Sequence, residues 1–127
     1  MAALSNYAAS KLNDHSNGVA SYTEPTIYVA LFTVTPTAST AGTEANYTGY
    51  ARVALSGLMG TSTNGSASNT SNITFGLCTA GTNTITGFAF MDASTGGNVI
   101  KFGSCSLSVS TGITPQFATG NLTSTMS

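Results

Sequence analysis

The stretch TIYVALFTVTP, residues 26 to 36, contains no charged side chain and has the β-branched and aromatic composition of a strand. Its residues alternate between two largely apolar faces, one with Ile27, Val29, Leu31 and Thr33 and the other with Tyr28, Ala30, Phe32 and Val34. Neither face suits water, so we expect a central strand that is covered on both sides. The stretch therefore predicts the packing centre of a β fold.

Short runs of the same kind follow to the end of the chain, separated by Gly, Asn, Ser and Thr. We predict strands at Ile27–Val34, Tyr50–Leu55, Asn72–Leu77, Ile85–Asp92, Asn98–Ser106, Leu107–Ser110, Pro115–Thr119 and Leu122–Met126. Regular spacing of this type favours an antiparallel β-sandwich, here jelly-roll-like, or a barrel. With 127 residues, the chain is expected to form one domain, residues 1 to 127, whose β body covers residues 26 to 127.

One short N-terminal helix is expected within residues 1 to 18. Leu4, Tyr7, Ala8 and Leu12 recur at helical spacing, and Asn17-Gly18 supplies a C-terminal stop. A helix of this length is marginal alone, so its apolar stripe should dock on the body of the domain or on a neighbouring subunit. That stripe is also a candidate cover for the second face of residues 26 to 36.

Three connecting segments have distinct characters. Residues 92 to 98, DASTGGN, predict a hairpin turn opened by Asp92, with two glycines able to take positive φ. In the following strand, alternation places Ile100 and Phe102 inward and Lys101 outward. The segments Pro36–Gly49 and Ser56–Ser71 are expected to be loops, the second a low-complexity tip with Leu58 and Met59 at its base.

Low charge excludes several classes of function. The 3 Lys+Arg and 4 Asp+Glu leave a formal net charge of -1, too few cations for nucleic-acid binding. No apolar run is long enough to span a bilayer, and MAALSNYAASK lacks the features of an export signal, so a protein made in the cytoplasm without a membrane anchor is expected. Free buried thiols are favoured for Cys78 and Cys105 over a single disulfide, because a reducing compartment keeps thiols reduced.

The residues available for catalysis are few. His15 is the only histidine, and the acids are Asp14, Glu24, Glu44 and Asp92. His15 is best explained by the end of the helix and Asp92 by its turn, while Glu24 and Glu44 lie in predicted loops. Neither a catalytic pair nor a metal or cofactor site is predicted. A small glycan-cleaving enzyme using Asp92 and Glu44 is the least favoured hypothesis.

Arg52 is unusual because it interrupts the apolar run GYARVAL, residues 49 to 55. An arginine among aromatic side chains is typical of a protein interface. Alternatively, its stem lies over its own sheet while its head pairs with Glu24 or Glu44. Both interpretations remain open at this point.

The order of several segments is more specific than any one of them. LSNYAASKLNDH is followed by YTEPTIYVALFTVTPT, AGTEANYTGYARVAL, SNTSNITFGLCTA, ITGFAFMDASTGGNVIKFGS and FATGNLTSTMS. This series resembles a family of small bacteriophage virion proteins, often labelled tail fibre proteins, some of which are similar to capsid cement or decoration proteins. The resemblance implies a β-sandwich that binds an assembled particle and catalyses no reaction.

The leading hypothesis is a capsid decoration (cement) protein on the capsid surface of the virion, which would bind the major capsid protein and stabilise the assembled shell. A homo-oligomer is expected, with a trimer favoured over a dimer. The contact elements would be residues 1 to 18 and 36 to 49, with the candidate interface residues Tyr7, Leu12, Tyr22, Tyr47, Tyr50 and Arg52. The alternative is a tail fibre or receptor-binding component whose loop Gly57–Ser71 contacts host glycans, although that loop contains no aromatic residue.

Overall fold

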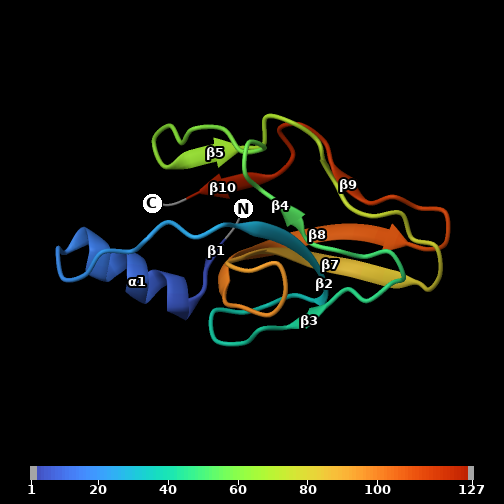
Figure 1. The fold of residues 1–127 in the computed structure, drawn as a ribbon, viewed down its shortest axis with the longest axis horizontal. Helices are drawn as coiled ribbons and strands as arrows, with labels where there is room; N and C mark the ends of the chain where they lie inside the picture. The colour runs from blue at the N-terminus through green and yellow to red at the C-terminus, as the bar shows by residue number, and fades with distance from the viewer. Residues whose placement is uncertain (1–2, 126–127) are drawn as a thin grey trace.

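The computed structural model describes residues 3 to 125 and shows a mainly β protein with antiparallel sheets and one short N-terminal helix, as predicted (Figure 1). Its elements in chain order are β1 (Ala3–Leu4), α1 (Asn6–Ser16), β2 (Tyr28–Val34), β3 (Thr43–Glu44), β4 (Val53–Ala54), β5 (Ser66–Ser68), β6 (Ile73–Thr74), β7 (Asn83–Met91), β8 (Val99–Val109), β9 (Gln116–Phe117) and β10 (Thr123–Thr125). The end of the predicted last strand, Met126, lies outside the described residues.

The main sheet has the order β1-β8-β7-β2-β3, and β4 also pairs with β2. Two small ribbons, β10-β5 and β6-β9, lie on one side of this sheet (Figure 1). The main core is shared between these layers: Leu31 and Phe88 of the sheet belong to the same buried cluster as Ile73, Phe117 and Leu122. The two separate strands predicted at 98–106 and 107–110 are one continuous strand, β8.

The stretch that opens the sequence analysis lies at the centre of the sheet, with β7 on one side and β3 and β4 on the other. Val29 and Leu31 face the main core. Ala30 and Phe32 face a second cluster with Ala89 and Met91, and all four are at most 5% exposed. The middle of the second face is thus buried within the chain itself, whereas Val34 at its end is 57% exposed.

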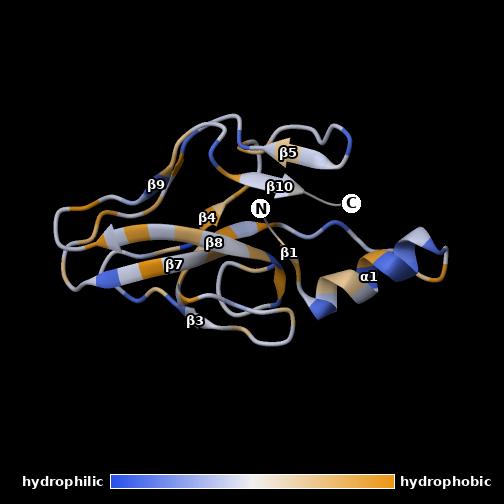
Figure 2. Cartoon of the chain, turned by 180° about the vertical axis from the view of Figure 1, so that it is seen from behind, coloured by the Kyte–Doolittle hydropathy of each residue, from blue (hydrophilic) through white to orange (hydrophobic). Residues whose placement is uncertain are grey.

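The helix differs from the expected stripe. Ser5 caps α1 by accepting a hydrogen bond from the Ala8 backbone N–H, so the helix begins at Asn6 and Leu4 belongs to β1. Ala8 is fully buried in the main core, whereas Tyr7 is 38% exposed. The predicted stop is confirmed, because the helix ends at Ser16 and Gly18 has φ 75°. Figure 2 shows long hydrophilic sections along α1, whereas hydrophobic residues recur along β7 and β8.

The predicted direction of Lys101 is wrong, and a β-bulge is the reason. Phe90 pairs with Lys101, but Met91 pairs with Val99, so Ile100 is an extra residue in β8. A bulge of this kind shifts the alternation by one position. Ile100 and Lys101 therefore both point toward the main core, and the Lys101 Nζ donates to the buried Ser124 Oγ at 2.6 Å.

The two predicted loops are more structured than expected. Residues 36 to 49 include β3 and bury Ala45 and Tyr47. Residues 56 to 71 include β5, and Leu58 and Met59 pack against the core as predicted. The hairpin at residues 92 to 98 is confirmed, with Gly96 and Gly97 at φ 61° and 77°.

Candidate functional site

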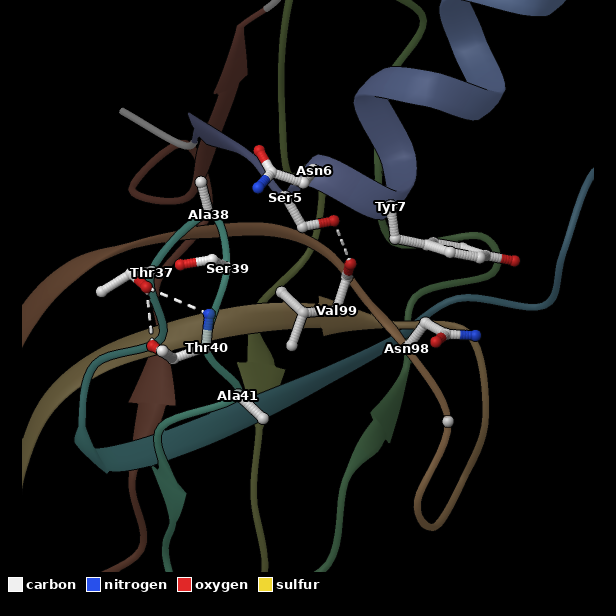
Figure 3. A pocket seen from close by; sticks show the side chains of 11 residues that line it. Ser5, Asn6, Tyr7, Thr37, Ala38, Ser39, Thr40, Ala41, Asn98 and Val99 are labelled. Carbon is white, nitrogen blue, oxygen red and sulfur yellow. Dashed lines mark hydrogen bonds between the residues drawn. The ribbon is translucent and has the colours of Figure 1, made fainter.

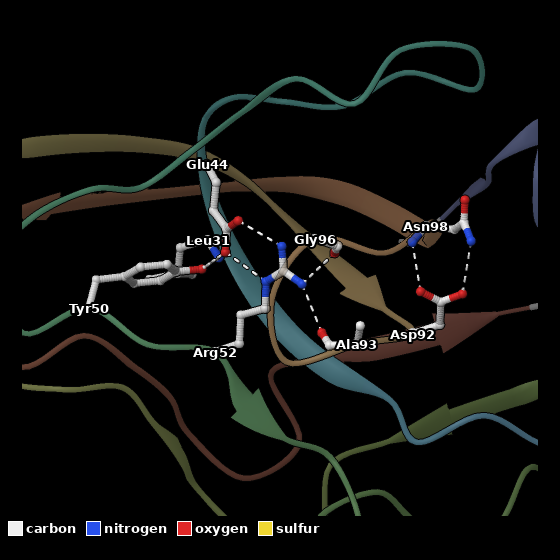
Figure 4. A network of polar contacts seen from close by, with 8 residues as sticks. All are labelled: Leu31, Glu44, Tyr50, Arg52, Asp92, Ala93, Gly96 and Asn98. Carbon is white, nitrogen blue, oxygen red and sulfur yellow. Dashed lines mark hydrogen bonds and ion pairs between the residues drawn. The ribbon is translucent and has the colours of Figure 1, made fainter.

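A polar network lies at the edge of β2, between β3 and β4 (Figure 4). The guanidinium of Arg52 binds both carboxylate oxygens of Glu44, with Nε to Oε2 and Nη2 to Oε1 each at 2.8 Å. Its Nη1 donates to the backbone oxygens of Ala93 and Gly96, both at 2.8 Å. Arg52 therefore joins the hairpin loop after β7 to strand β3.

Tyr50 extends this network to the central strand. Its hydroxyl donates to Glu44 Oε2 and accepts the backbone N–H of Leu31 at 3.1 Å. β2 pairs with β4 at Tyr28 and Val29 and with β3 from Phe32 onward, so Leu31 lies at the gap between these short strands. The Tyr50 side chain thus satisfies a backbone group that would otherwise lack a strand partner.

The charges in the network suit a structural role. Burial alone would raise the pKa of Glu44, but hydrogen bonds from Arg52 and Tyr50 and the charge of Arg52 outweigh it and hold that pKa below its usual value. Burial, together with the hydrogen bond to Glu44, raises the pKa of Tyr50. The carboxylate is therefore ionised and the phenol neutral near pH 7. Of the two interpretations of Arg52, the structure shows pairing within the chain, with its side chain only 6% exposed.

The predicted interface residues separate into two groups. Tyr47, Tyr50 and Arg52 are drawn inward: Tyr47 is 4% exposed, donates to the Gly76 oxygen at 2.8 Å, and packs edge-on against Tyr50. Tyr7 and Leu12 lie on α1, and Leu12 is partly buried. Tyr22 lies in the segment after the helix.

Tyr22 has an unusual hydroxyl. It is buried, and it has no hydrogen-bond partner among residues 3 to 125. Burial, with Tyr7 and Asp92 nearby, raises the pKa of Tyr22. A buried polar group without a hydrogen-bond partner is uncommon in folded proteins.

A cavity of about 340 Å³, lined by both polar and apolar groups, was not predicted from the sequence, and Tyr22 is not among its lining residues. Three segments line it: residues 5 to 7 at the start of α1, residues 37 to 41, and residues 97 to 99 (Figure 3). The sequence analysis expected residues 1 to 18 and 36 to 49 to be contact elements. No pattern in the chain indicates that these two elements meet. They are joined directly, because the Asn6 N–H donates to the Ala38 oxygen at 2.8 Å, and Ser5 also donates to the Val99 oxygen in β8.

Asp92 and His15, which were considered for catalysis, each form a hydrogen bond with the backbone. Asp92 accepts the Asn98 backbone N–H at 2.6 Å within its turn, and the His15 Nδ1 accepts the Tyr22 backbone N–H at 3.3 Å. Both cysteines are free thiols, and burial raises the pKa of Cys105 to about 11. Within residues 3 to 125, no cluster of three or more His, Cys, Asp or Glu could hold a metal ion, and no helix is long and apolar enough to cross a membrane.

Comparison with known proteins adds the family. A family model described as "Podophage GP4 fiber I protein gp80" matches residues 3 to 125. The chain belongs to this family. It is therefore a phage fibre protein and a structural component of a virion. No curated protein matches the chain.

The family match confirms that this gp80 fibre family member is a phage virion protein, as the resemblance in the sequence indicated. The family description supports the tail fibre alternative better than capsid decoration. The matched range includes the whole network and the whole cavity. The segment AGTEANYTGYARVAL, which contributed to the resemblance, supplies Glu44, Tyr50 and Arg52, so its two ends are joined by one set of tertiary contacts.

Proposed function

We propose that this protein is a structural component of the podophage tail fibre, where it binds neighbouring virion proteins and catalyses no reaction. The observation that carries the proposal is the family match over residues 3 to 125. The low charge of the chain supports it, because few ions lose their hydration when such a surface is buried in a permanent assembly.

The rigid network around Arg52 also fits this role. It holds the hairpin loop of residues 92 to 98 against β3 through four hydrogen bonds of one guanidinium. A fibre component transmits force between its attachment and its tip, so loops held by charge-assisted hydrogen bonds are suited to it.

The location in the virion is tested by labelling. A small peptide tag inserted in the exposed loop at Thr61–Gly65 would be detected with gold particles on intact virions by electron microscopy. We expect label on the tail fibres. Label confined to the capsid surface would overturn the proposal and support the capsid decoration hypothesis. An untagged virion serves as the control for nonspecific gold.

We also propose that the protein forms a homo-oligomer, a trimer rather than a dimer. Leu77 and Ile113 support self-association, because they are 48% and 44% exposed and lie close together, with the Cys78 N–H bonded to the Ile113 oxygen. Native mass spectrometry of the recombinant protein should give a trimer, and Leu77→Ser should shift it toward monomer. A monomer at all concentrations would contradict this part of the proposal.

A further inference from the structure

The cavity between α1 and residues 37 to 41, which has both polar and apolar groups in its walls, has the features of a small binding site (Figure 3). Its volume of about 340 Å³ is near the lower end of the range for ligand sites. Its walls come from three separate segments of the chain, each fixed by hydrogen bonds. Ser5 donates to the Val99 oxygen, and the Asn6 N–H donates to the Ala38 oxygen at 2.8 Å. The site is thus preformed.

The lining indicates a neutral ligand. The residues around the cavity include no Asp, Glu, Lys, Arg or His. The start of α1 is also a poor anion site, because two of its first N–H groups already have partners, Asn6 with the Ala38 oxygen and Ala8 with the Ser5 Oγ. Phosphate, sulfate and carboxylate groups would therefore meet no charged side chain among the lining residues, and the cation of Lys11 lies outside the lining, against the Tyr7 ring.

The polar groups that remain available are amides and hydroxyls. Asn98 is held by Asp92 through its backbone N–H at 2.6 Å and its Nδ2 at 3.1 Å, which leaves its Oδ1 as an acceptor. The Asn6 side chain is exposed and makes no hydrogen bond within residues 3 to 125. Each amide can both donate and accept, as paired ligand hydroxyls require.

An aromatic ring completes the wall. Tyr7 and Asn98 both line the cavity, and in Figure 3 the Tyr7 ring extends away from residues 37 to 41, on the same side of the view as Asn98. The ring is 38% exposed, and the Lys11 Nζ lies 5.8 Å from its centroid. An exposed aromatic ring next to amides presents an apolar surface and hydrogen-bonding groups together, which matches the mixed surface of a sugar ring.

We propose that this cavity binds a neutral saccharide unit, with Tyr7 against the sugar ring and Asn6 and Asn98 bonded to its hydroxyls. The inference rests on the proposed fibre function only in that a fibre meets the glycans of a host surface. It also places glycan contact away from the loop Gly57–Ser71, which has no aromatic residue.

The inference is tested on the isolated protein by amide chemical shifts. We would titrate D-glucose, D-galactose, D-mannose and N-acetyl-D-glucosamine separately, with inorganic phosphate as the charged comparison. At least one sugar should shift the amides of residues 5 to 7, 37 to 41 and 97 to 99, with a dissociation constant on the order of 1 mM, as a small open site allows. Phosphate should leave them unchanged.

Substitutions at Tyr7 and Asn6 test whether these residues bind the sugar. Tyr7→Ala should weaken binding about tenfold or more, whereas Tyr7→Phe should retain it within about twofold because the ring remains. Asn6→Ala should also weaken it. Thr63→Ala, in the β5 loop far from the cavity, is the matched control and should leave binding unchanged. Circular dichroism would confirm that each variant is folded.

Three results would overturn the site: no shift with any of the four sugars, equal binding by the Tyr7→Ala variant, or shifts of the same amides with protein concentration alone. Shifts that depend on protein concentration alone would show that the cavity is a contact between copies of this chain. These outcomes are independent of gold labelling on the virion, so the site can fail while the fibre location holds, and the reverse.

Discussion

Arg52 is the residue on which most of the polar network depends. Its replacement by alanine would leave Glu44 without its cation and the oxygens of Ala93 and Gly96 without a donor. Because Glu44 is partly exposed, water would replace some of these bonds, and we expect Arg52→Ala to lower the free energy of unfolding by about 2–3 kcal/mol. Urea denaturation measures this change.

The controls for Arg52 separate charge from geometry. Arg52→Lys keeps the charge but not the paired bonds to Glu44, so it should recover only part of the loss. Lys11→Met removes an exposed cation on α1 and should stay within about 0.5 kcal/mol of the native protein. Equal stability of Arg52→Ala and the native protein would show that the network contributes nothing.

Glu44 should make the stability depend on pH. Its pKa in the folded protein lies below the usual value of 4.5, so the unfolded chain binds the proton more readily. The stabilisation is complete above about pH 4.5 and is lost as the pH falls through the lowered pKa. Glu44→Gln should therefore have a flatter decline in the free energy of unfolding between about pH 5 and about pH 3.

Urea denaturation of Glu44→Gln and of the native protein at a series of pH values measures this difference in the pH dependence of stability. Glu24→Gln is the matched control, because Glu24 is exposed and forms no salt bridge within residues 3 to 125. A decline in Glu44→Gln as steep as in the native protein would contradict the assignment to Glu44.

At the scale of the elements, the bulge at Ile100 decides the environment of Lys101. The shifted alternation places this lysine in a partly apolar space with Phe90, Ile100 and Ser124, and burial lowers its pKa. No carboxylate among residues 3 to 125 lies within salt-bridge distance of it. Lys101→Met keeps the length and removes the buried charge, so we expect the free energy of unfolding to rise by about 1 kcal/mol.

Thermal and urea denaturation of Lys101→Met against the native protein measure this effect, with Lys11→Met as the exposed comparison. The opposite sign, a loss larger than about 1 kcal/mol, would mean that the bond to Ser124 outweighs the cost of burying the charge.

The elements that the sequence predicted are those with a repeated pattern. β2, β7 and β8 are long and rich in apolar or β-branched residues, and the Asp92–Asn98 turn has its own chemistry. β1, β3 and β5 were not predicted, because they lie in segments whose pattern favours a helix or a loop. β4, β6, β9 and β10 are equally short but lie within longer predicted strands. The bulge was not predicted either, because one inserted residue leaves the composition of β8 unchanged.

At the scale of the whole molecule, sequence patterns do not predict contacts between segments that are far apart in the chain. Arg52 pairs with Glu44 eight positions earlier, and its position in the apolar run did suggest that partner or Glu24. Its bonds to Ala93 and Gly96 and the meeting of residues 5 to 7 with 37 to 41 depend on the path of the chain through the main sheet. Those contacts are tertiary and leave no local signal.

The same layered arrangement predicts a single cooperative unit, as expected if the chain forms one domain. The two-stranded ribbons are too small to be stable alone, and Leu122, beside β10, is 1% exposed in the same cluster as Leu31 and Phe88. Leu122→Ala should therefore cost about 2–5 kcal/mol and lower protection from hydrogen exchange equally in β7, β8 and the β10-β5 ribbon. Loss of protection confined to the ribbon, with β7 and β8 unchanged, would instead divide the chain into two independently stable parts. Ser108→Ala, on an exposed position of β8, is the control and should leave all three profiles unaltered, because it removes no buried atoms.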